Sequence, residues 1–276
     1  MGMAVYETKL ILYKRKKPMN DAVITRIEDR KGFIKLNRPE KRNAMSPELI
    51  SSLHQSFVEM NQNEEVKVII LEAEGKAFCA GADLSYMQKL QEFSYVENLE
   101  DSKHLKDLFT LIYTLPKVVI AQIQGHALAG GCGLVTVCDF AFAVPNALFG
   151  YTEVRIGFVP ALVSVFLAEQ IGMAKTQELL LSGELISAAK AAELGLITEV
   201  CHDEFLEKGV LDFADKLIHQ NSGASMATTK NLLRSIHQVN RQQSLEHACE
   251  VNAKARSHED CVKGISSFLN KTNPNW

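Results

Sequence analysis

Two glycine-rich loops, each expected between a strand and a helix, constrain the fold of this chain more than any other feature of its sequence. They span residues 77–83 (AFCAGAD) and 125–133 (GHALAGGCG). Each loop can leave backbone N–H groups unpaired at the start of a helix, where the helix dipole also favours negative charge. If the two sets of N–H groups converge, they form an oxyanion hole. For either loop alone, glycines that merely permit tight turns and close packing are an equally good interpretation.

The order of strand and helix signals predicts an α/β core followed by helices. Strands are expected at residues 22–28, 32–36, 66–71, 118–123, 139–143, around Phe149, and at 196–200. Helices are expected at residues 46–60, 82–90, 104–115, 134–137, 160–171, 204–220 and 224–240. Because strands stop near residue 200, we predict an N-terminal extension (1–20), a core (21–200) and a helical region (201–276).

Charge and cysteine content weaken several functional classes. The net charge of −3 and the pI near 6.3 leave no excess of positive charge to hold nucleic acid. The six cysteines lack the paired spacing of a zinc or redox site, so we expect no metal. The second loop lacks the lysine and hydroxyl of a nucleotide-binding loop, which disfavours nucleotide hydrolysis. Without a membrane-spanning run or a secretory signal, we expect a cytoplasmic protein with no membrane partner.

A third segment, residues 149–160 (FGYTEVRIGFVP), places the carboxylate Glu153 among apolar neighbours and close to glycines. Partial burial would raise the pKa of this glutamate towards neutrality, which suits proton transfer. The alternative is a surface glutamate that forms an ion pair with Arg155. From the residues alone, both interpretations remain open.

Together these segments resemble the crotonase superfamily, whose members act on acyl-CoA thioesters. The resemblance runs from about residue 21 to residue 271. It rests on the motifs LNRP and NA (36–39 and 43–44), FCAGAD (78–83), GxAxxGGC (125–132), CD (138–139) and FGxxEVRIG (149–157). It implies an α/β spiral of β-β-α units, and a C-terminal helical region that builds homotrimers, commonly paired into hexamers. No cofactor is expected beyond the coenzyme A of the substrate.

The resemblance also implies a set of site residues. It places the oxyanion hole at the backbone N–H groups of Ala82 and Gly130, makes Glu153 the acid–base group, and puts the family's first catalytic glutamate at Gly133. Tyr151 and Thr152 are expected to shape the acyl pocket. The residues expected along coenzyme A are Lys41, Arg42, Ala44, Ala80, Asp83, Phe268 and Lys271.

Glycine at position 133 leaves Glu153 as the single carboxylate. This suits a Δ3-Δ2-enoyl-CoA isomerase, or a hydratase in which Glu153 orients the water with help from a backbone group, another side chain or the substrate. The combination of GGCG with EVRIGFVPA looks like bacterial 3-methylglutaconyl-CoA hydratases of leucine breakdown, and this is the predicted activity. The isomerase is the main alternative, and a broad fatty-acyl hydratase comes third. A noncatalytic acyl-CoA-binding or RNA-binding protein is the alternative of another class.

Several polar side chains invite functional interpretations of different strength. The distal carboxylate of a methylglutaconyl group would need a cationic partner, for which Arg155 and Lys89 are candidates by charge. For Arg155 a structural role is the favoured interpretation. For His126 we expect packing or a local hydrogen bond rather than base catalysis. Cys132 has no evident partner base nearby in sequence and is not expected to be a nucleophile.

Overall fold

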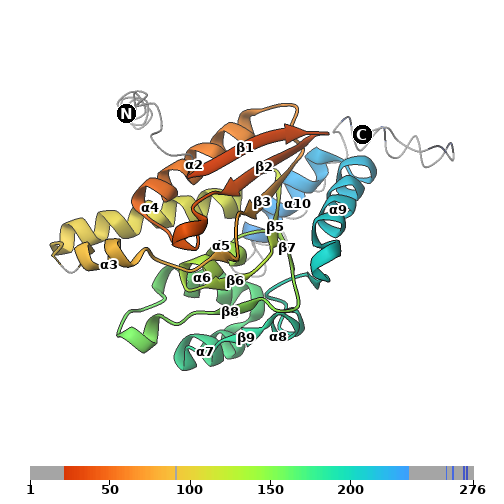
Figure 1. Ribbon diagram of the computed structural model, residues 1–276. Helices are drawn as coiled ribbons and strands as arrows, with labels where there is room; N and C mark the ends of the chain where they lie inside the picture. The colour runs from red at the N-terminus through yellow and green to blue at the C-terminus, as the bar shows by residue number, and fades with distance from the viewer. Residues whose placement is uncertain are drawn as a thin grey trace, which may run out of the picture.

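The computed structural model describes residues 22–90 and 92–235, together with residues 259, 263, 270 and 272. Two sheets lie at the centre of the described chain, and helices pack around them (Figure 1). The six-stranded sheet has the order β1-β2-β3-β5-β7-β10, and the four-stranded sheet has the order β4-β6-β8-β9. The β1–β2 and β8–β9 pairs are antiparallel, and the other pairs are parallel.

The larger sheet consists of β1 Val23–Glu28, β2 Lys31–Leu36, β3 Val68–Ala73, β5 Val118–Ile123, β7 Phe140–Ala143 and β10 Glu199–Val200. The smaller sheet consists of β4 Ala77–Cys79, β6 His126–Leu128, β8 Leu148–Gly150 and β9 Ile186–Ser187.

The chain repeats one unit, which is a strand of the larger sheet, a strand of the smaller sheet and then a helix. In the first repeat β3 and β4 lead to the helices α3 (Leu84–Leu90) and α4 (Tyr95–Thr114), and in the second β5 and β6 lead to α5 (Gly130–Thr136). In the third, β7 and β8 lead to η2 (Glu153–Ile156) and α6 (Ala161–Ile171). This spiral of β-β-α units confirms the expected fold class. Because β4, β6 and β8 are parallel neighbours, the segments that follow them meet at one edge of the smaller sheet.

The remaining helices complete the covering of the sheets. Helix α2 (Pro47–Gln62) begins as expected, since the Ser46 side chain accepts a hydrogen bond from the Leu49 N–H at 3.3 Å and proline occupies the first helical position. The other elements are η1 Pro39–Lys41, α7 Met173–Ser182, α8 Ala188–Glu193, η3 Asp203–Phe205, α9 Leu206–Gln220 and α10 Gly223–Ser235.

Several predicted boundaries are wrong, each for a local reason. Helix α4 begins at Tyr95 instead of residue 104, because Ser94 and Glu97 form a reciprocal capping box that the apolar periodicity does not reveal. Helix α5 begins at Gly130 instead of residue 134, because its glycines take part in the first helical turn. Residues 77–79 and 126–128 are strands within the predicted loops. The last strand is shorter than expected, and α7 and α8 were not predicted.

Beyond Val200 the described elements are helical, as expected. Helix α9 packs directly on the larger sheet, since the Phe213 ring centroid lies 4.8 Å from that of Phe140 and 5.2 Å from that of Phe142. The division at residue 201 stays a prediction. The predicted extension (1–20), and most of the chain after residue 235, lie outside the described residues.

Candidate active site

The two glycine-rich loops lie side by side, on the expected edge of the smaller sheet. Gly81 approaches the second loop closely: a Cβ built on it would lie 3.0 Å from the Ala129 Cβ and 3.1 Å from the Leu128 carbonyl oxygen. Met45 forms an isolated parallel bridge with Ala82, accepting from the Asp83 N–H (2.8 Å) and donating to the Gly81 carbonyl (2.7 Å). The N–H of Ala82 takes no part in this bridge. Ala82 is exposed at the surface.

The second loop places the first turn of α5 next to this bridge. Gly130 is the first residue of α5, so its N–H has no acceptor one turn earlier within the helix. A Cβ on Gly130 would lie 2.1 Å from Met45 Cε, so Met45 neighbours both Ala82 and Gly130. Ala129, the residue before the helix, holds a φ of 49°, a conformation that costs a non-glycine residue about 1–3 kcal/mol. Its N–H donates to the Gly150 carbonyl at 2.7 Å, which fixes this strained residue against the end of β8.

Glu153 follows β8, the third of the parallel strands at this edge. It is the first residue of η2 and lies two residues after Tyr151. The Tyr151 hydroxyl lies 2.6 Å from Thr136 Oγ1 on α5. Burial is the main cause that raises the pKa of the Glu153 carboxyl above its ordinary value. Its Oε2 atom is buried and has no hydrogen-bond partner among the described residues. No ion pair joins Glu153 to Arg155 in this part of the chain, so the alternative of a surface ion pair is wrong.

The raised pKa of Glu153 leads to a pH prediction. If the carboxylate form removes a proton, kcat/KM should rise with pH through a midpoint above that of an ordinary glutamate, about 4.3. A pH–rate profile from about pH 4 to pH 8 measures this midpoint. A midpoint at or below the ordinary glutamate value would contradict the assignment of Glu153 as the base.

The two residues expected to line the acyl pocket differ in their solvent exposure. Thr152 is half-buried, but the Tyr151 side chain has no accessible surface and packs beneath α5. Tyr151 therefore supports the site from inside the core and does not line an open pocket. Its hydroxyl forms a hydrogen bond with the Thr136 hydroxyl. Gly133 is buried within α5, whereas the sequence pattern predicted it in the loop before a helix that starts at residue 134.

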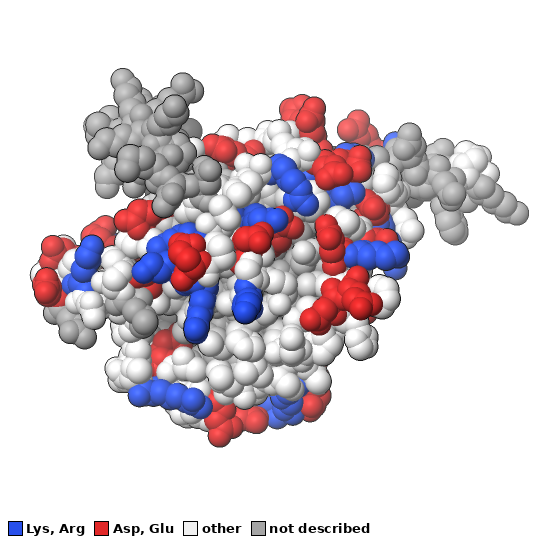
Figure 2. Space-filling view, in the orientation of Figure 1, with Lys and Arg blue, Asp and Glu red and all other residues white. Residues whose placement is uncertain are grey.

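The residues expected along coenzyme A partly share one surface. Lys41 and Arg42 are exposed, and the Ala80 N–H donates to the Arg42 carbonyl at 3.0 Å, so their turn lies against the first glycine-rich loop. Ala44 is buried. Figure 2 shows Lys and Arg side chains mixed with Asp and Glu side chains on this face of the molecule, beside a broad area without charged side chains. Two further expected residues, Phe268 and Lys271, lie outside the described residues.

Asp83 has a different role from its neighbours in the first loop. Its side chain is buried, pairs with Arg38 Nη2 at 3.2 Å, and accepts hydrogen bonds from the Ser85 and Tyr86 N–H groups at the start of α3. The Ser85 hydroxyl, these N–H groups and the Arg38 charge lower the pKa of the Asp83 carboxyl. Asp83 therefore holds the loop in place, and its carboxylate is not free for a ligand.

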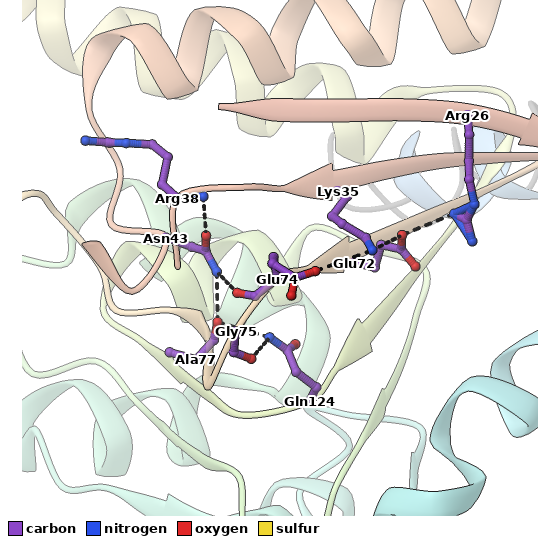
Figure 3. Close-up of polar contacts among 9 residues, drawn as sticks. All are labelled: Arg26, Lys35, Arg38, Asn43, Glu72, Glu74, Gly75, Ala77 and Gln124. Carbon is purple, nitrogen blue, oxygen red and sulfur yellow. Dashed lines mark hydrogen bonds and ion pairs between the residues drawn. The ribbon is translucent and has the colours of Figure 1, made fainter. Parts of the chain in front are cut away.

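A buried amide joins the Arg38–Ala44 turn to the strand that precedes the first loop (Figure 3). Asn43 Nδ2 donates to the carbonyl oxygens of Glu74 (2.8 Å) and Ala77 (2.9 Å), and Asn43 Oδ1 accepts from the Arg38 N–H (2.8 Å). Gln124, just before β6, donates to the Gly75 carbonyl at 3.0 Å. Sequence reasoning missed Asn43 as a positioning residue. Its signal was weak, because asparagine at a positive φ (54°) is common in exposed turns as well.

Two side chains that resemble catalytic groups have local roles. His126 Nδ1 accepts a hydrogen bond from the Leu148 N–H at 3.1 Å, which confirms the expected local contact between β6 and β8. Burial raises the pKa of the Cys132 thiol to about 12, so the thiol is protonated at neutral pH and a poor nucleophile. Among the described residues, no group of three His, Cys, Asp or Glu side chains could hold a metal ion. None of the described helices is both long and apolar enough to cross a lipid bilayer.

Comparison with known proteins identifies the family. Residues 28–276 match the enoyl-CoA hydratase/isomerase family. The chain belongs to this family. A Thermus thermophilus protein that carries the provisional name enoyl-CoA hydratase is 36% identical over 241 residues, which cover 87% of this chain and 95% of that protein. The Escherichia coli 2,3-dehydroadipyl-CoA hydratase is 29% identical over 94% of this chain and 99% of its own length. The crystal structure of an enoyl-CoA hydratase from Mycobacterium smegmatis matches with a TM-score of 0.87 and 30% identity, covering 94% of this chain and 99% of that one.

Family membership settles the class of protein at a coarse level. This member of the enoyl-CoA hydratase/isomerase family is an enzyme of the enoyl-CoA hydratase/isomerase type that acts on acyl-CoA thioesters. The noncatalytic binding protein, which the sequence left open, is therefore disfavoured.

Proposed function

We propose that the enzyme hydrates an enoyl-CoA thioester with Glu153 as its only acid–base carboxylate. The thioester oxygen accepts hydrogen bonds from the N–H groups of Ala82 and Gly130. Glu153 takes a proton from water while the water oxygen bonds to C3, and the enolate forms with its charge on the thioester oxygen. The carboxyl group then returns the proton to C2. The observation that carries this proposal is the buried Glu153 Oε2, which has no hydrogen-bond partner among the described residues, on a carboxylate whose charge acts on Cys132 of α5.

Isomerisation is the second candidate, and a specific observation favours it. Gly133 offers no side chain, and a Cβ built there would lie 2.8 Å from Phe109 Cζ, so a second carboxylate has no room. A single carboxylate can remove a proton at C2 and return it at C4 without water. Incubation in heavy-oxygen water separates the two reactions, because only hydration places solvent oxygen in the product.

For the substrate, we propose 3-methylglutaconyl-CoA. The sequence resemblance noted above supports it, and the name of the Escherichia coli relative denotes an acyl group that also ends in a carboxylate. Arg155 is the better candidate for binding this carboxylate, since it is exposed on η2, the element that begins with Glu153. Lys89 is exposed on α3, but its charge already acts on the carboxyl group of Glu48.

An Arg155→Ala variant tests this binding role. A lost charge-assisted hydrogen bond costs about 1.5–3 kcal/mol, so KM for 3-methylglutaconyl-CoA should rise by about 10-fold or more. Steady-state kinetics with crotonyl-CoA, which lacks a distal carboxylate, provides the control and should change little. An unchanged KM for 3-methylglutaconyl-CoA would show that Arg155 does not bind the substrate.

A panel of enoyl-CoA thioesters, with products identified by mass, tests the proposed function as a whole. We expect addition of one water to 3-methylglutaconyl-CoA. Absence of any product from the whole panel would overturn the proposal, and products of unchanged mass with a shifted double bond would favour the isomerase.

For the assembly, we propose a homotrimer or a pair of trimers in the cytoplasm. Large apolar side chains that are exposed in the single chain support association: Ile156, Phe158 and Val159 are 65%, 58% and 67% exposed. Sedimentation of the purified protein measures the number of subunits.

A further inference from the structure

The ring of Phe109 fills the space beside Gly133. Phe109 lies on α4 and is 1% exposed. A Cβ added to Gly133 would lie 2.8 Å from Phe109 Cζ and 2.9 Å from Cε2, and 3.7 Å from Val163 Cγ2 on α6. The aromatic ring therefore packs directly against the backbone of α5. A side chain at Gly133 would have to displace this ring.

The position of this contact on α5 relates it to the proposed site of the thioester. Gly133 follows Gly130 by three residues, which places it about 4.5 Å farther along the axis of α5. Gly133 is also the neighbour of Cys132, whose thiol is close enough to Glu153 for the carboxylate charge to raise its pKa. If the thioester oxygen lies at the Gly130 N–H and C2 and C3 lie near Glu153, carbons beyond C3 that continue along α5 meet the Phe109 ring.

Behind the ring, the structure is apolar. The Phe109 ring meets that of Phe166 edge to face, with centroids 6.3 Å apart and planes at 81°. Val163, on the same helix as Phe166, is buried. Space opened in such surroundings stays free of water and takes up hydrocarbon. Removing the ring should therefore create room that suits additional methylene groups.

We propose that Phe109 limits the length of the acyl group, which makes short-chain enoyl-CoA thioesters the substrate class of this enzyme. This inference rests on the proposed function, because it needs the thioester to lie between Gly130 and Glu153. It assigns Phe109 a role in specificity and leaves proton transfer to Glu153.

A Phe109→Ala variant, assayed with crotonyl-CoA and with trans-2-octenoyl-CoA, tests the proposal. One methylene group in an apolar pocket changes kcat/KM by about 10-fold or more, so the ratio of kcat/KM for the octenoyl substrate to that for crotonyl-CoA should rise by at least about 10-fold. Phe109→Leu should raise the ratio by less, and it serves as the milder variant if Phe109→Ala does not fold.

Phe57→Ala is the matched control. Phe57 is also a fully buried phenylalanine, but it lies on α2, so its loss should destabilise the fold to a similar degree. The substrate ratio of this variant should stay that of the unchanged protein. A ratio that stays constant in both Phe109 variants, or rises equally in Phe57→Ala, would overturn the proposal. If the unchanged enzyme converted neither these two thioesters nor 3-methylglutaconyl-CoA, the proposed function itself would fail.

Discussion

Glu153→Gln should reduce turnover of enoyl-CoA substrates by about 100-fold to 10,000-fold, the usual contribution of a positioned acid–base group. Glutamine keeps the shape of the side chain but cannot take up or return the proton. Binding of the thioester should persist, since the N–H groups of Ala82 and Gly130 and the exposed Lys41 and Arg42 are unchanged. Steady-state kinetics measures the loss, and equilibrium binding of a nonreactive acyl-CoA measures retention.

The same substitution should stabilise the fold at neutral pH. Burial raises the pKa of Glu153 in the folded protein, so the folded state favours the protonated form. Such a group contributes stability below its unfolded pKa, and this contribution is lost as the pH rises through the folded pKa. At neutral pH the buried carboxylate is therefore unfavourable, and Glu153→Gln should melt at a higher temperature than the unchanged protein.

Glu193→Gln is a suitable control for both measurements. Glu193 ends α8 and pairs with Lys190 at 2.7 Å on the protein surface, so its loss should alter neither turnover nor melting temperature appreciably. If Glu153→Gln retained full turnover, another group would have to move the proton.

The parts of the site that the sequence predicts are those determined by local signals. The glycines of the two loops and the carboxylate of Glu153 stand out in the sequence, and their order along the chain matches the order of β4, β6 and β8. Once these strands pair in parallel, the three segments must meet at one edge. This is why a candidate site could be predicted without coordinates.

The parts that the sequence does not predict depend on packing between distant segments. Phe109 reads as one apolar residue of an amphipathic helix, and only the contact of α4 with α5 places its ring against Gly133. Tyr151 lies only two residues before Glu153, yet the turn into η2 places the two side chains in different surroundings: Tyr151 is fully buried in the core, whereas Glu153 Oε2 has no hydrogen-bond partner among the described residues. Asp83 likewise belongs to the first loop, but its carboxylate forms an ion pair with Arg38. A motif fixes the backbone path more reliably than the direction of each side chain.

The backbone of α5 should tolerate no side chain at Gly131. A Cβ added there would lie 2.3 Å from the Cys79 carbonyl oxygen, and backbone atoms of β4 cannot move aside as a flexible side chain can. Gly131→Ala should therefore push the first turn of α5 away from β4 and separate the N–H groups of Gly130 and Ala82. Because loss of one oxyanion-hole donor typically costs about 100-fold to 1,000-fold in kcat, turnover should fall by at least about 100-fold.

Gly209→Ala separates this effect from a general response to replacing glycine. Gly209 lies within α9, where a Cβ would lie 3.4 Å from Cys201 Sγ, an ordinary van der Waals contact. Alanine in a helix is more stable than glycine by roughly 0.5–1 kcal/mol, so this variant should keep its turnover and melt no lower than the unchanged protein. Gly131→Ala should lose stability by about 1–3 kcal/mol, as overpacked cores do. Full turnover in Gly131→Ala would mean that catalysis does not depend on how closely α5 approaches β4, and the oxyanion hole assigned to Ala82 and Gly130 would have to be abandoned.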